Sequence, residues 1–394
     1  MKRCSKIFLI IAGISTIIYS QEINHLKINS AVIDSNSVLQ VKNIFTHEFS
    51  YVGDFINNLR GGIKQDSQYL GIAHLFLKFE TGNIGLWNGG VFFINGASTH
   101  GGTPSNDLIG DFQTASNIEA GNHTFFQELW FKQSFNNIEM KIGLQDLNTE
   151  FVVSEFSSDF LNSSFGVPSV ISDNVPVPIF PLTSLGIMGK FSLGENFSIS
   201  TALYDGMPEA FEHNEYNINW SLDKEHGLLF FTEMDYSTSV NELPCIIKVG
   251  GYYHSHLNEF NNETNDYKSV FSSNYGFYLI GDQTIWQFQD NKKLGVFAQL
   301  AVSPANVNLH NYYFGAGINF QNIFAKSKFG IALAHAGFNS HDIKNETTFE
   351  IFFKKEIVQN LFIQPDVQYI INPAGTDNKL NNSLVAFIRF GINF

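Results

Sequence analysis

Short segments in which apolar and polar residues alternate recur along the chain, and clusters of Gly, Asn, Asp and Ser separate them. A period of two is typical of a β-strand with one apolar and one polar face. The expected strands are Tyr69–Phe79, Gly90–Asn95, Phe125–Phe135, Ile138–Leu144, Ser184–Phe191, Phe197–Tyr204, Leu228–Tyr236, Ile246–His256, Tyr275–Ile280, Thr284–Gln289, Leu294–Val302, Tyr312–Phe320, Ser327–Ala336, Thr347–Lys354, Leu361–Ile371 and Ser383–Phe394, with one further strand inside His47–Leu59. The pattern therefore predicts an all-β protein with about 16 strands.

The last of these segments shows the alternation most clearly and ends on a phenylalanine. Its apolar face comprises Leu384, Ala386, Ile388, Phe390, Ile392 and Phe394, and its other face comprises Ser383, Arg389, Gly391 and Asn393. Such a division suits a sheet with apolar solvent on one side and water on the other. We therefore expect this segment to be the closing strand of a membrane β-barrel.

Charged and amide side chains share one face in several other segments. These polar faces are Glu233 and Asp235 in Leu228–Tyr236, Lys248, Tyr252, His254 and His256 in Ile246–His256, and Gln364, Asp366 and Gln368 in Leu361–Ile371. A Lys or Arg on the lipid face of a barrel costs about 2–4 kcal/mol at the bilayer midplane. The polar faces are thus predicted to line the lumen. A soluble β-sandwich would show the same alternation in any single strand.

A sandwich does not explain the combination of the strand number, the aromatic content, the terminal Phe394 and the N-terminal signal described below. The 394 residues are 44% hydrophobic, with a mean hydropathy of -0.04, and after the N-terminal segment no stretch of eighteen residues is free of polar interruption. Apolar spanning helices are thereby excluded, so a chain that crosses a membrane has to form a closed barrel. The 40 Phe, 14 Tyr and 4 Trp suit the aromatic girdles of such a barrel. We therefore predict a transmembrane antiparallel β-barrel.

The N-terminus has the pattern of a secretory signal. Lys2, Arg3 and Lys6 precede the apolar run Ile7–Ile18, and the small residue Ser20 offers a cleavage site. The run is short for a membrane anchor, which is the alternative. We predict a removed signal peptide at residues 1–20, a short periplasmic segment at 21–46 and an outer-membrane barrel domain at 47–394.

Charge and cysteine content narrow the possible partners. The formal charge of -14 becomes -17 once residues 1–20 are removed, because three cations and no acid leave. Nucleic-acid binding requires clustered Lys and Arg, so this acidic chain is not expected to bind it. Only one cysteine, Cys245, remains after removal, and a single thiol forms no internal disulfide.

Two stretches break the alternation and are predicted to be long loops. Gly96–Thr124 is rich in Gly, Ser, Thr and Asn, and Gln145–Thr183 contains Pro168, Pro176, Pro178 and Pro181. Loops of this length are usually functional. We expect both to fold inward and constrict the channel, because a barrel of this size is otherwise wide. The alternative places both outside the barrel.

An ordered series of short motifs covers nearly the whole chain after residue 50. They include Gly53-Asp54, Asn58-Leu59-Arg60-Gly61-Gly62, Gly85-Leu86-Trp87, Thr99-His100-Gly101-Gly102, Gln127-Glu128-Leu129-Trp130, Gln145-Asp146-Leu147-Asn148, Ser154-Glu155, Asn162-Ser163-Ser164-Phe165-Gly166, Asn174-Val175-Pro176-Val177-Pro178, Tyr204-Asp205-Gly206-Met207-Pro208 and the run from Gln364 to Pro373. In these motifs the chain resembles the carbohydrate-selective porins of the OprB type. The resemblance implies a sixteen-stranded outer-membrane barrel through which sugars diffuse, with a pore narrowed by inward loops.

Five residues inside the matching motifs are the candidates for the pore lining: Arg60, Glu128, Trp130, Asp146 and Glu155. Glu128 and Trp130 are two residues apart and share a strand face with Lys132, which we expect to look into the channel. Trp130 would otherwise belong to an aromatic girdle. Arg60 could donate several hydrogen bonds to a passing sugar or to Asp146 or Glu155. The alternative is that it holds a loop through an ion pair in the lumen. Asp366 and Arg389 are interpreted as wall charges.

No catalytic, metal or cofactor site is expected. His254 and His256 share a face but lack a third ligand, and a zinc site needs three or four.

The expected partners are small carbohydrates, outer-membrane lipid and lipopolysaccharide, and the barrel assembly machinery, which would contact the strand ending at Phe394. The protein is expected to be a monomer or a trimer. One alternative is a general diffusion porin. A second is an outer-membrane barrel enzyme such as a lipase, but we cannot assemble the serine triad that it needs. A third is an energy-coupled receptor, which needs a plug domain inside the barrel.

Overall fold

The computed structural model describes residues 45–261, 266–271, 273–288, 292–340, 343–376 and 379–394. The predicted signal peptide and all but the last two residues of the segment 21–46 lie outside the described residues. Among the described residues, no helix has the length and apolar character needed to cross a membrane.

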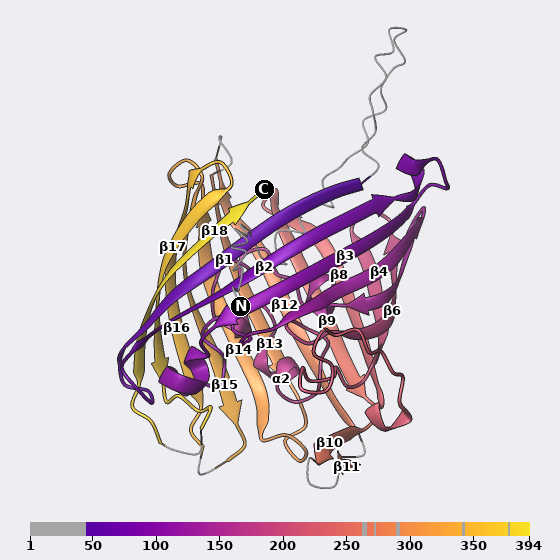
Figure 1. Ribbon diagram of the computed structural model, residues 1–394. Coiled ribbons are helices and arrows are strands. Elements are labelled where there is room, and N and C mark those ends of the chain that lie inside the picture. Colours follow the sequence, from indigo (N-terminus) through magenta and orange to yellow (C-terminus); the bar gives the residue numbers. More distant parts are fainter. Residues whose placement is uncertain (1–44, 262–265, 272, 289–291, 341–342, 377–378) are drawn as a thin grey trace, which may run out of the picture.

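Sixteen antiparallel strands close into one barrel (Figure 1). They are β1 (Phe45–Arg60), β2 (Ser67–Glu80), β3 (Gly90–Gly101), β4 (Thr124–Phe135), β5 (Ile138–Gln145), β6 (Ser184–Leu193), β7 (Phe197–Asp205), β8 (Leu228–Val240), β9 (Leu243–His254), β12 (Asn274–Gln287), β13 (Lys293–Val302), β14 (His310–Gln321), β15 (Ser327–Phe338), β16 (Glu346–Val358), β17 (Leu361–Ile371) and β18 (Ser383–Asn393). Each strand pairs with its neighbours in sequence, and β1 pairs with β18 to close the ring. The predicted fold class is confirmed.

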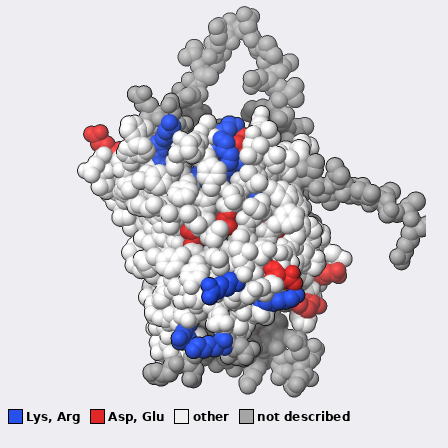
Figure 2. Space-filling view, turned by 90° about the vertical axis from the view of Figure 1, so that its left-hand side faces the viewer, with Lys and Arg blue, Asp and Glu red and all other residues white. Residues whose placement is uncertain are grey.

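The strand faces follow the sequence pattern. In β17, the side chains of Gln364, Asp366 and Gln368 are buried, whereas Ile363 and Tyr369 on the other face are 37% and 41% exposed. Their burial places the polar face toward the lumen, where it contacts the inner loops described below. Figure 2 shows that most of one outer wall is uncharged and that its basic side chains lie toward the two ends. This is the surface expected of a wall in contact with lipid.

One sequence prediction about strands was wrong. Tyr275–Ile280 and Thr284–Gln289 form one strand, β12, although Gly281 and Asp282 have the composition of a turn. Asp282 stays within the strand because its carboxylate points into the lumen and accepts a hydrogen bond of 2.7 Å from the Ser154 hydroxyl. The hairpin of β10 (Leu257–Asn261) and β11 (Asp266–Phe271) was also not predicted.

The connections differ in length at the two ends of the barrel. The end near the C-terminus carries short turns, such as 136–137 and 359–360, and we call it the turn end. The opposite end carries the long connections 102–123, 146–183 and 206–227, and we call it the loop end. Because β3 continues to Gly101, the first of these loops is shorter than the predicted stretch Gly96–Thr124.

The loops 102–123 and 146–183, called L2 and L3 below, fold into the barrel. Buried phenylalanines of L3 pack against phenylalanines of the wall, and L3 also carries the short helix α2 (Ser169–Ser172), which lies against β13 and β14. The ring centroids of Phe160 and Phe352 are 4.8 Å apart, and those of Phe151 and Phe231 are 5.1 Å apart. Burying a phenylalanine stabilises by about 1.5–3 kcal/mol. L3 therefore forms a hydrophobic core inside the barrel.

Candidate pore constriction

Carboxylates on the inner wall bind the backbone of L3. Glu233 of β8 accepts a hydrogen bond of 2.8 Å from the N–H of Val152, and Glu350 of β16 accepts bonds from the N–H groups of Leu161 and Asn162 at 2.5 and 3.0 Å. Hydrogen bonds to a charged acceptor are about twice as strong as neutral ones. The wall thus replaces the partners that a loop lacks when it leaves water.

An aspartate of L3 is clamped by two lysines of the wall. Asp159 lies 2.9 Å from the ammonium of Lys328 on β15 and 3.3 Å from that of Lys354 on β16, and it also accepts from the amide of Asn319 at 3.1 Å. Burial alone would raise the pKa of Asp159, but the two ammonium groups outweigh it and hold the pKa below its usual range. The clamp therefore fixes the middle of L3 across the lumen.

L2 is attached to the wall near the closure of the barrel. Glu346 at the start of β16 accepts bonds from the N–H groups of Phe112 and Gln113 at 2.8 and 3.0 Å. The amide of Gln368 donates to the carbonyl of Ala115 at 2.8 Å. L2 and L3 therefore enter the lumen from one end and share the same wall.

An arginine and an aspartate bridge the closing seam and hold L2. Arg389 of β18 donates from Nε and Nη2 to the two carboxylate oxygens of Asp54 on β1, at 2.7 and 2.8 Å. Nη2 also donates to Oδ1 of Asn117 in L2 at 2.8 Å, and the Ser116 hydroxyl donates to Asp54 at 2.7 Å. A bidentate pair of this kind fixes the guanidinium in one orientation.

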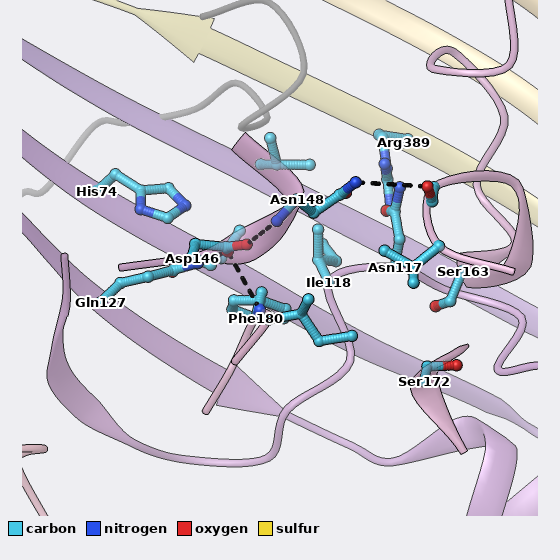
Figure 3. A pocket seen from close by; sticks show the side chains of 15 residues that line it. His74, Asn117, Ile118, Gln127, Asp146, Asn148, Ser163, Ser172, Phe180 and Arg389 are labelled. Atoms are coloured by element: carbon cyan, nitrogen blue, oxygen red, sulfur yellow. Dashed lines mark hydrogen bonds between the residues drawn. The ribbon is translucent and has the colours of Figure 1, made fainter. Parts of the chain in front are cut away.

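A cavity of about 130 Å³ remains between L2, L3 and the wall (Figure 3). A single water needs about 10–15 Å³ by a comparable measure, so the cavity holds several. Its lining comprises Val52, Ile72, His74, Gln127 and Arg389 from the strands, Asn117 and Ile118 from L2, and Asp146, Asn148, Ser163, Gly166, Val167, Ser172, Ile179 and Phe180 from L3. Amides, hydroxyls, apolar side chains and two charged groups thus line one cavity.

Asp146 begins L3 and is the acidic member of this lining. Its carboxylate accepts from the Gln127 amide at 2.8 Å, from the N–H of Asn148 at 2.9 Å and from the N–H of Phe180 at 3.2 Å. Burial raises the pKa of Asp146, and these three donors oppose the increase because they favour the charged form. The same bonds join the two ends of L3, as Figure 3 shows.

Glu128 and Trp130 are turned to the inside of the barrel, as their spacing predicts. The Trp130 ring is 9% exposed, stacks on Phe93 with centroids 4.7 Å apart, and donates from Nε1 to Glu128 at 3.0 Å. The ammonium of Lys141 lies 5.0 Å from the same ring. This position does not fit an aromatic girdle in lipid. Whether the pair meets a sugar stays a prediction.

The other two candidates lie away from the cavity. Arg60 is exposed at the loop-end terminus of β1 and does not line it. Glu155 pairs with Lys293 at the start of β13, and its N–H donates to Asp282 at 3.2 Å. The structure therefore brings Asp146 to the cavity, places Arg60 at the rim, and places Glu155 in L3 against β12 and β13 of the opposite wall. Hydrogen bonds from Arg60 to Asp146 or Glu155 are not found among the described residues.

Arg389 is the lining residue that sequence reasoning underestimated. It was interpreted as a wall charge only, whereas it lines the cavity and holds L2 through Asn117. Its pairing with Asp54 would have followed from placing the first and last strands side by side, because both are polar residues on the same face of a closing sheet. Asn148 lies in the motif Gln145-Asp146-Leu147-Asn148, but no comparable signal in the sequence identifies Asn117 or Phe180.

The two histidines considered as metal ligands contact backbone carbonyls instead. His254 lies 2.7 Å from the carbonyl oxygen of Gly206, and His256 lies 2.8 Å from that of Lys224. In the described part of the chain, no group of three or more His, Cys, Asp or Glu side chains is placed to hold a metal ion.

Comparison with solved structures shows the same fold. The chain is similar to the high-pH structure of OprB from Pseudomonas putida, with a TM-score of 0.76, 21% identity and coverage of 89% of this chain and 94% of that one. The low-pH structure of the same protein gives a TM-score of 0.57, 17% identity and coverage of 89% and 92%. A loop-deletion mutant of OmpT, an outer membrane protein of Vibrio cholerae, gives a TM-score of 0.52 and 9% identity. The comparison covers 89% of this chain and 99% of that one.

Comparison of sequences identifies the family. No curated protein sequence matches the chain. Residues 64–394 match the family described as "Carbohydrate-selective porin, OprB family". The match spans most of the chain, and both family and fold point to a channel rather than an enzyme. The chain belongs to the carbohydrate-selective porin, OprB family, and is an outer-membrane channel through which carbohydrates diffuse.

Proposed function

We propose that sugars cross the barrel along the cavity between L2, L3 and the wall, and that Arg389 and Asp146 are the charged groups they meet there. The observation that carries this proposal is that both long loops are bonded to the wall and leave a cavity lined by these two residues. The loops narrow a barrel whose interior would otherwise be a wide aqueous channel.

The lining offers the contacts that a sugar requires. In the described part of the chain, Nη1 of Arg389 has no hydrogen-bond partner, so its N–H groups can donate to hydroxyls, while Asp146 and Asn148 can accept. Phe180 and Ile118 supply apolar surface for the C–H faces of the ring. A few weak contacts of this kind orient a solute without trapping it, which passive flux requires.

Glu128 and Trp130 extend the proposed route toward the turn end. They lie on the inner face of β4, next to the strand positions that line the cavity. Arg60 and Glu155 are proposed to meet a sugar at the rim and on the opposite wall, respectively.

We also propose how the chain reaches and sits in the membrane. Residues 1–20 direct export and are removed, residues 21–46 lie in the periplasm, and residues 47–394 form the barrel domain. The turn end faces the periplasm, because outer-membrane barrels have short periplasmic turns and long external loops. The exposed Phe394 ends a strand whose pairing with Phe49 closes the sheet, and we assign this strand to recognition by the assembly machinery. The wall contacts lipid and lipopolysaccharide in a monomer or a trimer.

A liposome-swelling assay tests the proposal. Proteoliposomes are given glucose, a disaccharide and an uncharged amino acid at equal osmolarity. Faster swelling with the sugars than with an amino acid of smaller size supports a sugar channel. Rates ordered by solute size alone would favour a general porin, and no swelling with any sugar would contradict the proposal.

A further inference from the structure

The cavity lining carries two charged side chains, and only one of them is neutralised. The guanidinium of Arg389 forms a bidentate pair with the fully buried carboxylate of Asp54. Asp146 accepts hydrogen bonds from three neutral N–H donors, and in the part of the chain that the structure describes it has no ion pair. Neutral donors stabilise a carboxylate without cancelling its charge.

Nearby lysines do not compensate Asp146, because each has its own acid. The ammonium of Lys141 lies 2.9 Å from Glu150, and that of Lys132 lies 3.2 Å from Glu139. Because Asp54 neutralises Arg389, the cavity lining has a net negative charge, which Asp146 carries.

Resting on the proposed function, we infer that Asp146 gives the channel charge selectivity: it admits neutral and cationic sugars and rejects anionic ones such as uronic acids. A solute in this cavity exchanges part of its water for protein, so the repulsion between two carboxylates is less screened than in bulk water. Acidic side chains select cations in other channels by the same principle. A neutral sugar of equal size meets no such repulsion.

The reversal potential in a planar bilayer under a KCl gradient measures this selectivity directly. The wild-type channel should prefer potassium to chloride, and Asp146→Asn should abolish most of that preference. The matched control is Glu195→Gln, which removes one exposed acid from the turn between β6 and β7 at the turn end of the barrel and should leave the reversal potential close to wild type. Asn148→Asp adds a second carboxylate to the same cavity and should strengthen the preference, so this variant decides the question should Asp146→Asn not fold.

Swelling assays with glucose and glucuronate extend the test to sugars of similar size. We expect glucose to enter at least about tenfold faster, and Asp146→Asn to reduce the difference. Equal rates in the wild type, or an unchanged reversal potential in both cavity variants, would overturn the inference while leaving the sugar channel intact. Failure of glucose to enter would contradict the proposed function instead, and the reversal potential would still decide the charge selectivity.

Discussion

The two sides of the barrel interior use similar polar side chains for different purposes. On the side formed by β8 and β12–β17, acids, amides and lysines such as Glu233, Glu350 and Lys354 are occupied by bonds to L3. On the side formed by β1, β2, β4 and β18, side chains such as Gln127 and Arg389 face a cavity. A polar strand face therefore does not by itself mark the solute path. We propose that the path lies on the side where the inner loops leave this cavity.

The largest effect is expected when L3 is released from its wall. Replacing Asp282 and Glu350 together by Ala removes the acceptors of five hydrogen bonds to L3. The donors are the Ser154 hydroxyl and the N–H groups of Glu155, Phe156, Leu161 and Asn162. Each buried donor left without a partner costs about 1–3 kcal/mol. The single-channel conductance should rise several-fold and should no longer fall when sugar is added. A conductance equal to that of the wild type would mean that L3 does not constrict the pore.

The second effect concerns the closing seam. Arg389→Ala leaves the carboxylate of Asp54 buried without its cation, at a cost of about 3–5 kcal/mol. The melting temperature should fall and the conductance should rise, because L2 loses its bond through Asn117. The double variant Asp54→Asn with Arg389→Gln removes both charges and should recover most of the stability. No recovery would show that the guanidinium acts through other contacts.

The third effect is on sugar passage at the inner face of β4. Trp130→Ala removes a ring that stacks on Phe93, and it leaves Glu128 without the indole donor. If this face meets the solute, the extent to which added sugar lowers the ion conductance of the channel in bilayers should change by several-fold. Phe131→Ala, on the opposite face of the same strand, is the control. Unchanged sugar conductance in Trp130→Ala would exclude this face from the route.

The fourth effect is on pH dependence. Because burial raises the pKa of Asp146, its carboxylate takes up a proton at a higher pH than a free aspartate, whose pKa is about 3.9. Preference for cations should be present above this raised pKa and should be lost as the pH falls through it. Reversal potentials measured from about pH 8 to about pH 3 test the direction. The Asp146→Asn variant should show a smaller change over the same range.

The smallest effect is expected at the rim. Arg60 is exposed and lies outside the cavity lining, so Arg60→Ala should change the free energy of unfolding by no more than about 0.5 kcal/mol. Sugar conductance should also stay near the wild-type value. A large loss of sugar conductance would instead place a solute contact at the rim, as the sequence motif implies.

The sequence alone determined the barrel and the direction of its side chains. A period of two, as in Leu361–Ile371, fixes which residues face lipid and which face water, because each polar group on the lipid side is costly. The prediction of a turn at Gly281 and Asp282 was wrong, because the hydrogen bond from Ser154 of L3 to Asp282 cannot be read from the local composition.

The tertiary structure alone decided the pore. Only it shows that L3 occupies one wall, that Arg389 meets Asp54 across the closing seam and that Asp146 remains without a cation. These contacts join residues far apart in the chain, which no local pattern encodes.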